Sequence, residues 1–274
     1  MRRRRFRTLV NTVIGLFLTA VMLFPLYWMI NVSLTPSHEL LSTNPPLFPQ
    51  DPTFDGYRSA LSQQLPSLAT SITIGIGTAF FAMLIAIPAA YAMSKLRVRG
   101  SEPIMVVLLV AQLLPAVVLT MALFALYARV GLINTYPGLI FANATAAIPL
   151  SVIVLRAFMN RIPDELLEAA RVDGAGKLRM LHAIVIPLSR NAIITASLLS
   201  FLIAWADFIF ARSLTSGNEI VPFTLALFRF IGADTTNWNG VMATAVIASV
   251  PAILLLTVAQ RYIAGGITAG SLKD

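Results

Sequence analysis

The sequence predicts an all-α integral membrane protein with six transmembrane helices, and three observations support this fold class. The 274 residues are 57% hydrophobic and only 12% charged, whereas soluble domains are about 45–50% apolar and about 25% charged. The apolar residues gather in runs of about 20, the length that crosses a hydrocarbon core of about 30 Å as a helix. The basic residues lie between these runs. The net charge of +8 therefore fits a membrane topology better than a nucleic-acid surface.

Six stretches meet this length criterion, and each is expected to be helical because lipid offers no partners for backbone N–H and C=O groups. In chain order they are Leu9–Ile30, Ser67–Met93, Pro103–Tyr127, Pro137–Phe158, Ala192–Ala211 and Gly240–Ile263. Five prolines inside them predict kinks, at Pro25, Pro88, Pro115, Pro149 and Pro251. Residues 1–8 then form a basic N-terminal segment, 9–263 the transmembrane domain with its six spans and 264–274 a tail.

The first stretch follows Arg2–Arg5 and Arg7, and basic residues also precede the apolar region of a secretory signal peptide. The apolar run here exceeds the usual 7–15 residues or so of such a peptide, and no small-residue cleavage site follows it. We therefore expect a retained membrane anchor.

The distribution of Lys and Arg predicts that both termini are cytoplasmic, because basic residues concentrate in cytoplasmic loops. In that orientation all but four of the 20 Lys and Arg residues lie inside, the exceptions being Arg58, Arg129, Arg212 and Arg229. Residues 31–66, 131–136 and 213–239 then form outer loops, and residues 95–102 and 161–189 form inner ones.

The longer inner loop, residues 161–189, predicts a helix, a turn and a second helix. Pro163 suits the first turn of a helix, where its missing N–H is not needed. Asp164 and Glu165 follow near the positive end of the helix dipole, and Gly174 can end the helix in a left-handed conformation.

The second helix is expected over Lys177–Val185 and is expected to stop at Pro187. By itself this pattern leaves two interpretations open. The segment either lies on the membrane surface as a simple connection, or it is a docking surface that needs a partner protein.

The same segment resembles the EAA motif of ABC importer permeases. It contains Glu168-Ala169-Ala170, the Asp173-Gly174 pair and, after nine further residues, Ile184-Val185-Ile186-Pro187. Ile186 departs from the leucine that the family usually has there. The resemblance implies a coupling helix that docks into a groove on an ATPase subunit. It assigns this coupling role to Glu168, Ala169, Ala170, Asp173, Gly174, Ile184 and Pro187.

Other stretches are similar to the carbohydrate branch of that family, the maltose-type permeases. They are Pro25–Met29, Ala89–Ala92, Gly131–Tyr136, Gln260–Tyr262 and Trp205-Ala206-Asp207, where the family usually has Trp-Asn-Asp. The resemblance implies the type I ABC importer permease fold in a bacterial cytoplasmic membrane. It also implies a second permease subunit, two ATPase subunits and an extracytoplasmic sugar-binding protein. The substrate would be an oligosaccharide, an amino sugar or a glycerol-phosphate compound.

No ATP-binding loop is readable in the sequence. Ala175-Gly176-Lys177-Leu178 comes near to one, but residue 171 is Arg instead of the first Gly, and Leu178 cannot hold magnesium as Ser or Thr would. The chain has no Cys and only two His, so a metal site is not expected either. We therefore expect a transport subunit that is not itself an enzyme and has no cofactor, with ATP bound by partner subunits.

Four polar or aromatic residues within the predicted spans are candidates for the substrate path, because polar groups in lipid are costly and often functional. Asp207 is the clearest, but it could equally be a structural charge paired with Arg212 or with the partner permease. Gln112 and Asn143 could face sugar hydroxyls or join helices. Trp205 completes the set, although an interfacial aromatic belt is the ordinary explanation for Trp28, Trp205 and Trp238.

Two other classes of membrane protein remain open from the sequence. A polytopic enzyme would need a catalytic constellation, and no Ser-His-Asp or paired-carboxylate arrangement is readable. A channel or secondary transporter would work without an ATPase, and copurification with a nucleotide-binding subunit distinguishes it from an importer.

Overall fold

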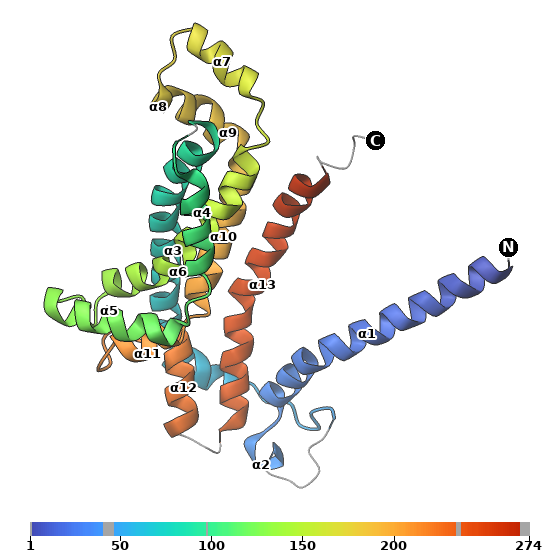
Figure 1. The fold of residues 1–274 in the computed structure, drawn as a ribbon. Helices are drawn as coiled ribbons and strands as arrows, with labels where there is room; N and C mark the ends of the chain where they lie inside the picture. The colour runs from blue at the N-terminus through green and yellow to red at the C-terminus, as the bar shows by residue number, and fades with distance from the viewer. Residues whose placement is uncertain (1, 41–46, 97, 234–236, 269–274) are drawn as a thin grey trace. The chain divides into compact units, whose positions relative to one another are not determined.

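A computed structural model describes residues 2–40, 47–96, 98–233 and 237–268, and all regular secondary structure in these ranges is helical (Figure 1). The chain divides into two units. The first comprises Met1–Leu65 and Leu227–Val250, and the second comprises Pro66–Ala226 and Pro251–Asp274. Residues 41–46, Arg97 and residues 269–274, the end of the predicted cytoplasmic tail, lie outside the described residues.

Four helices of the described chain are long and apolar enough to cross a membrane, and two bent helix pairs raise the number to as many as six. Six is the number that the sequence predicts. The four long helices are α1 (Arg2–Leu34), α3 (Asp55–Lys95), α6 (Tyr136–Met159) and α13 (Trp238–Thr268). Pro25, Pro88, Pro149 and Pro251 lie inside these helices without ending them.

The third predicted span, Pro103–Tyr127, is not one continuous helix. It consists of α4 (Ser101–Ala111) and α5 (Ala116–Val130), which meet at an angle of 98°. Pro115 directly precedes α5 in an extended conformation and has no N–H to continue the hydrogen bonds of α4. Figure 1 shows α5 running across the end of α4. The proline therefore breaks this span where the sequence predicted only a kink.

The second bent pair joins Lys177–Leu188 to Arg190–Trp205 at 80°. The fifth predicted span, Ala192–Ala211, is itself divided. Helix α10 (Arg190–Trp205) ends first, and the short helix α11 (Ile209–Leu214) follows it. At about 1.5 Å per residue, α10 spans only about 24 Å, less than a hydrocarbon core of about 30 Å. A further helix, α12 (Phe223–Ala233), lies in the predicted outer loop.

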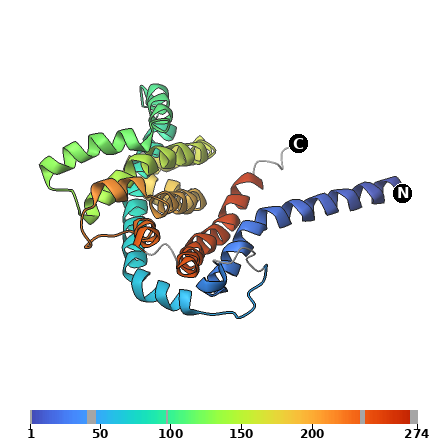
Figure 2. The same ribbon diagram turned by 90° about the horizontal axis from the view of Figure 1, so that it is seen from below.

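The second unit is built around α6 and α10, which pack side by side (Figure 2). The hydroxyls of Ser151 and Ser200 are 3.0 Å apart in this buried interface. Small side chains let the helix backbones approach closely, as is usual between membrane helices. The buried residues of this core include Ala82, Ala86 and Ala90 of α3, Val152 and Leu155 of α6, and Ala192 and Ala196 of α10.

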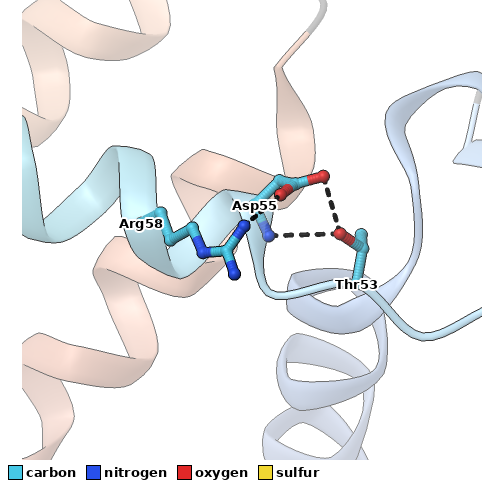
Figure 3. A network of polar contacts seen from close by, with 3 residues as sticks. All are labelled: Thr53, Asp55 and Arg58. Carbon is cyan, nitrogen blue, oxygen red and sulfur yellow. Dashed lines mark hydrogen bonds and ion pairs between the residues drawn. The ribbon is translucent and has the colours of Figure 1, made fainter.

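In the first unit, α1 is followed by the short helix α2 (Ser37–Leu40), and α3 begins at Asp55, well before the predicted start at Ser67. The start of α3 is held by the side chain of Thr53, which accepts a hydrogen bond from the Asp55 N–H at 3.2 Å and donates to the Asp55 carboxylate at 2.8 Å (Figure 3). Arg58 lies 3.5 Å from the same carboxylate. The Thr53 N–H also donates to the carbonyl of Leu34 at 2.9 Å, which ties the loop back to the end of α1.

We predict that Gly75→Ala destabilises the protein, because a Cβ at position 75 would lie 2.6 Å from Cε2 of the Phe201 ring. Such overpacking costs about 1–3 kcal/mol. The measurement is the thermal unfolding of the detergent-solubilised complex. Gly15→Ala in α1 is the control, since a Cβ there meets nothing within 4 Å. Equal melting temperatures for the wild type and Gly75→Ala would contradict the close packing of α3 on α10.

Candidate functional site: the helix–turn–helix after α6

The predicted inner loop forms a helix at the end of the second unit, beyond the ends of α3, α6 and α10 (Figure 1). Helix α7 (Asp164–Val172) starts directly after Pro163, with Asp164 and Glu165 in its first turn. This start agrees with the sequence prediction, since both carboxylates lie at the positive end of the helix dipole.

The turn after α7 is closed by backbone hydrogen bonds. Gly174 has φ +80°, its N–H donates to the carbonyl of Arg171 at 3.0 Å, and the Ala175 N–H donates to that of Ala170 at 2.8 Å. These are the two bonds of a Schellman motif, which requires a left-handed residue at the position of Gly174. The predicted left-handed conformation of Gly174 is therefore confirmed.

The second arm differs from the prediction. Helix α8 (Lys177–Met180) continues through a π-helical turn, Leu181–Val185, into α9 (Ile186–Leu188), so the helix is not stopped by Pro187. The Ile186 N–H donates to the carbonyl of Leu181, five residues earlier. A π turn widens the helix, which makes room for a proline ring that would collide with the preceding turn of an α-helix. The axis then bends by 80° into α10.

The residues of the predicted coupling motif divide between two faces. Ala170 and Ile184 are partly buried against the core of the second unit, together with the buried Leu167 and Met180. The side chains at the surface are those of Glu168, Ala169, Asp173 and Pro187, with Gly174 between them. One face therefore fixes the segment on the helical core, and the other is open to a partner.

Two apolar side chains on the open face were missed by sequence reasoning. Val172 is 89% exposed and Leu178 is 73% exposed, on either side of the turn at Gly174. Apolar residues of this size gain about 1.5–3 kcal/mol each when they are fully buried. Val172 is two residues after the partly buried Ala170, and residues two apart do not share a helix face, so its exposure could have been inferred from the sequence.

The burial of Lys95, at the end of α3, was not predicted either. In the sequence this residue counts only as one of the basic residues that place the loop on the cytoplasmic side. Its side chain is 4% exposed and pairs with the Asp164 carboxylate at 2.7 Å. It also donates to the carbonyl of Ile162 at 2.5 Å. One turn earlier, the Tyr91 hydroxyl donates to the carbonyl of Lys177 at 3.3 Å.

The four candidates for the substrate path lie in the second unit. The Asp207 carboxylate accepts hydrogen bonds from the N–H groups of Phe210 and Ala211, both at 3.1 Å, and so caps the start of α11. In the part of the chain that the structure describes, no ion pair joins Asp207 to Arg212. This geometry is that of a helix cap, a structural role different from the ion pair with Arg212 that the sequence suggested.

Gln112 and Asn143 each donate to a backbone carbonyl of α6, Gln112 to Ala146 at 3.1 Å and Asn143 to Leu139 at 3.0 Å. Gln112 thus ties the broken end of α4 to α6, as expected of an amide that joins helices. A contact between either of these side chains and the substrate stays a prediction.

Trp205 is buried in a stack of three aromatic rings, with the Phe201 and Phe223 ring centroids each 5.7 Å away. This position differs from the interfacial belt expected from its place near a span end. The chain folds back after α10, so that Phe223 of α12 covers the tryptophan. Trp238, by contrast, is exposed.

The described residues contain no group of three or more His, Cys, Asp or Glu that could hold a metal ion. The helix–turn–helix presents a turn with an open face of mixed polarity.

Comparison with known proteins identifies the family. Residues 82–268 match the family described as "Binding-protein-dependent transport system inner membrane component". The chain belongs to this family. It is thus a multi-pass inner-membrane permease subunit of an ABC importer, as the resemblance predicted, and a transport subunit without an ATPase site of its own.

Two curated relatives of this permease match nearly its whole length. It is 32% identical over 255 residues to a trehalose transport system permease protein of Mycobacterium tuberculosis, covering 92% of each chain. It is 34% identical over 268 residues to a trehalose/maltose transport system permease protein of Thermococcus litoralis, covering 95% of each.

Among solved structures, a chain of a bacterial ABC transporter that imports the acidic polysaccharide alginate has a TM-score of 0.81 to this permease. The two are 24% identical, and the match covers 96% of this chain and 98% of that one. This likeness shows that the two chains share a fold.

We predict that Asp207→Ala lowers stability by about 1–2 kcal/mol, the usual cost of losing a helix cap, because two N–H groups of α11 lose their acceptor. Thermal unfolding in detergent measures the change. Arg212→Gln is the control and is expected to stay within about 0.5 kcal/mol of the wild type. Equal destabilisation by both substitutions would instead indicate an Asp207–Arg212 ion pair.

Proposed function

We propose that this permease imports a carbohydrate, and that α7 and the turn at Gly174 couple it to an ATPase subunit. The observation that carries the coupling proposal is the exposed face of a turn whose inner face is anchored to the second unit. Glu168, Val172 and Leu178 offer one carboxylate and two apolar groups on an exposed surface of the predicted cytoplasmic loop. A groove on a partner protein would bury the apolar groups and pair the charge.

The full transporter would contain this chain, a second permease of similar fold, two ATPase subunits and an extracytoplasmic sugar-binding protein. Support for the last partner comes from a second alginate transporter structure, solved in complex with a pentasaccharide-bound periplasmic protein, whose chain has a TM-score of 0.68 to this one at 16% identity. The family description itself names binding-protein dependence.

The names of the relatives support a sugar as the substrate class, since they are permeases for trehalose and for trehalose or maltose. Both sugars are neutral disaccharides. The substrate would be delivered by the binding protein to the outer loops and released into a path between the two permeases. Amino sugars and glycerol-phosphate compounds remain alternatives within the same proposal.

Transport would proceed by alternating access. ATP binding closes the two ATPase subunits, the coupling turn moves with them, and the spans shift from inward-open to outward-open. A ligand changes such an equilibrium only by binding the two states with different affinity. The coupling turn therefore has to contact the ATPase differently, or at a different place, in the two states.

We predict that Gly174→Ala strongly reduces substrate-stimulated ATP hydrolysis in the reconstituted transporter. At φ +80° a side chain costs about 1–2 kcal/mol, roughly a tenfold shift in an equilibrium. Gly176→Ala is the matched control, because Gly176 has an ordinary φ of −71° and open space around its Cα. Glu168→Ala is expected to act in the same direction as Gly174→Ala. Full stimulation in both variants, with the complex intact, would rule out the coupling role.

We also predict that the binding protein encoded with this permease, loaded with trehalose, maltose or another short oligosaccharide, stimulates ATP hydrolysis in proteoliposomes. The reason is that a substrate-loaded binding protein favours the outward-open state. Ligand-free binding protein and the same protein with an amino acid are the controls. Stimulation by amino acids alone would contradict the carbohydrate assignment and leave the coupling role unaffected.

A further inference from the structure

Two side chains of α3 hold the coupling segment from both sides. Tyr91 and Lys95 are four residues apart, so they lie on the same face of the helix. Lys95 contacts the chain before α7, at the carbonyl of Ile162 and the carboxylate of Asp164. Tyr91 contacts the chain after the turn, at the carbonyl of Lys177. The two contacts bracket the segment from Glu168 to Gly174.

The burial of Lys95 is unusual for a lysine at the end of a membrane span. Such residues normally extend into water or the headgroup region. Removing an ammonium group from water costs several kcal/mol unless the charge is paired and hydrogen-bonded. Here one carboxylate and one carbonyl satisfy it at 2.7 Å and 2.5 Å. A basic residue needed only for membrane orientation would not need this environment.

The chain connections to the coupling turn are less direct, and the packing of Leu167 and Met180 on the core is apolar and therefore non-directional. The link from α6 runs through the bend at Asn160–Pro163, and the link to α10 runs through the π turn and the 80° bend at Ser189. Chain bends of this kind can change their angle when one end is pushed. The contacts of Tyr91 and Lys95 instead join the segment directly to the C-terminal end of the long helix α3.

A small hollow of about 200 Å³ lies beside the ion pair, lined by Lys95, Leu96, Asp164, Leu167, Glu168 and Arg171. Glu168, the acidic residue of the coupling motif, therefore lines the same hollow as the buried lysine. A force applied at Glu168 acts next to the contact between α7 and α3.

We propose that Tyr91 and Lys95 are positioning residues that clamp the coupling turn to α3, so that displacement of the turn by the ATPase moves the second span with it. This inference rests on the proposed coupling function of α7. It adds the path by which the movement enters the membrane domain. Neither residue would contact the ATPase or the substrate.

The test is the number of sugar molecules imported per ATP hydrolysed, measured in proteoliposomes with the complete transporter and its binding protein. Lys95→Met keeps the length of the side chain and removes the charge, and it leaves behind Asp164, whose side chain is 52% exposed and can be solvated. We expect ATP hydrolysis to continue while the sugar-to-ATP ratio falls about tenfold, the effect of weakening one coupling contact by roughly 1.4 kcal/mol.

Lys95→Arg is the conservative variant and is expected to restore more than half of the wild-type ratio, since its guanidinium can reach both the carboxylate and the carbonyl. The double variant Lys95→Met with Asp164→Asn is expected to be no worse than Lys95→Met alone, because the two residues form one contact. Arg99→Met is the matched control. It removes one positive charge from an exposed residue of the neighbouring cytoplasmic turn and should leave the ratio unchanged.

An unchanged ratio in Lys95→Met, with normal amounts of assembled complex, would overturn the inference. If Lys95→Met does not assemble, Tyr91→Phe decides, because it removes a single oxygen and retains the ring. A reduced ratio in Tyr91→Phe supports the clamp, and a wild-type ratio overturns it.

Gly174→Ala and Glu168→Ala are measured in parallel. If they impair coupling and the Lys95 and Tyr91 variants do not, only the clamp fails, whereas normal coupling in all four variants removes the coupling function itself.

Discussion

The structure depends first on the lack of hydrogen-bonding partners for the backbone in hydrocarbon. This constraint makes every span helical, and it also determines what happens where a helix is interrupted. At the break before α5, the side chain of Gln112 reaches Ala146 of α6. At the break before α11, the Asp207 carboxylate takes two of the N–H groups that have no partner within the helix. At both breaks, a polar side chain within a predicted span thus forms hydrogen bonds with backbone groups.

The number of spans and their order could be predicted from the sequence, because a run of apolar residues reports directly on burial in lipid. The broken third and fifth spans could not be, since hydropathy does not distinguish one helix from two short ones. Pro115 and Pro88 look alike in the sequence, yet Pro88 lies inside α3 and Pro115 separates two helices. The difference comes from the tertiary surroundings, which can satisfy the freed backbone groups in one case and favour a bend in the other.

The coupling segment was predictable at its first helix and less so at its second. Acidic residues after a proline, followed by a glycine, are local signals, and α7 and its turn depend on them. The π turn at Leu181–Val185 accommodates Pro187, but a proline in the sequence predicts the end of a helix equally well. The burial of Leu181 and Val185, which accompanies the continued helix, is a tertiary property. The sequence shows the positive charge of Lys95 but does not predict its burial. The burial arises from contacts with residues 67 and 69 positions further along the chain.

The turn after α7 owes its shape to backbone hydrogen bonds and one glycine, and not to the side chains that it displays. A preformed surface loses little conformational entropy when a partner binds. The exposed positions, Val172 and Leu178 among them, can therefore change in the course of evolution without reshaping the turn. Under the proposed coupling role, partner preference and docking geometry are separable properties of this segment, so a permease of this design could keep its mechanism while its lineage exchanged one ATPase subunit for another.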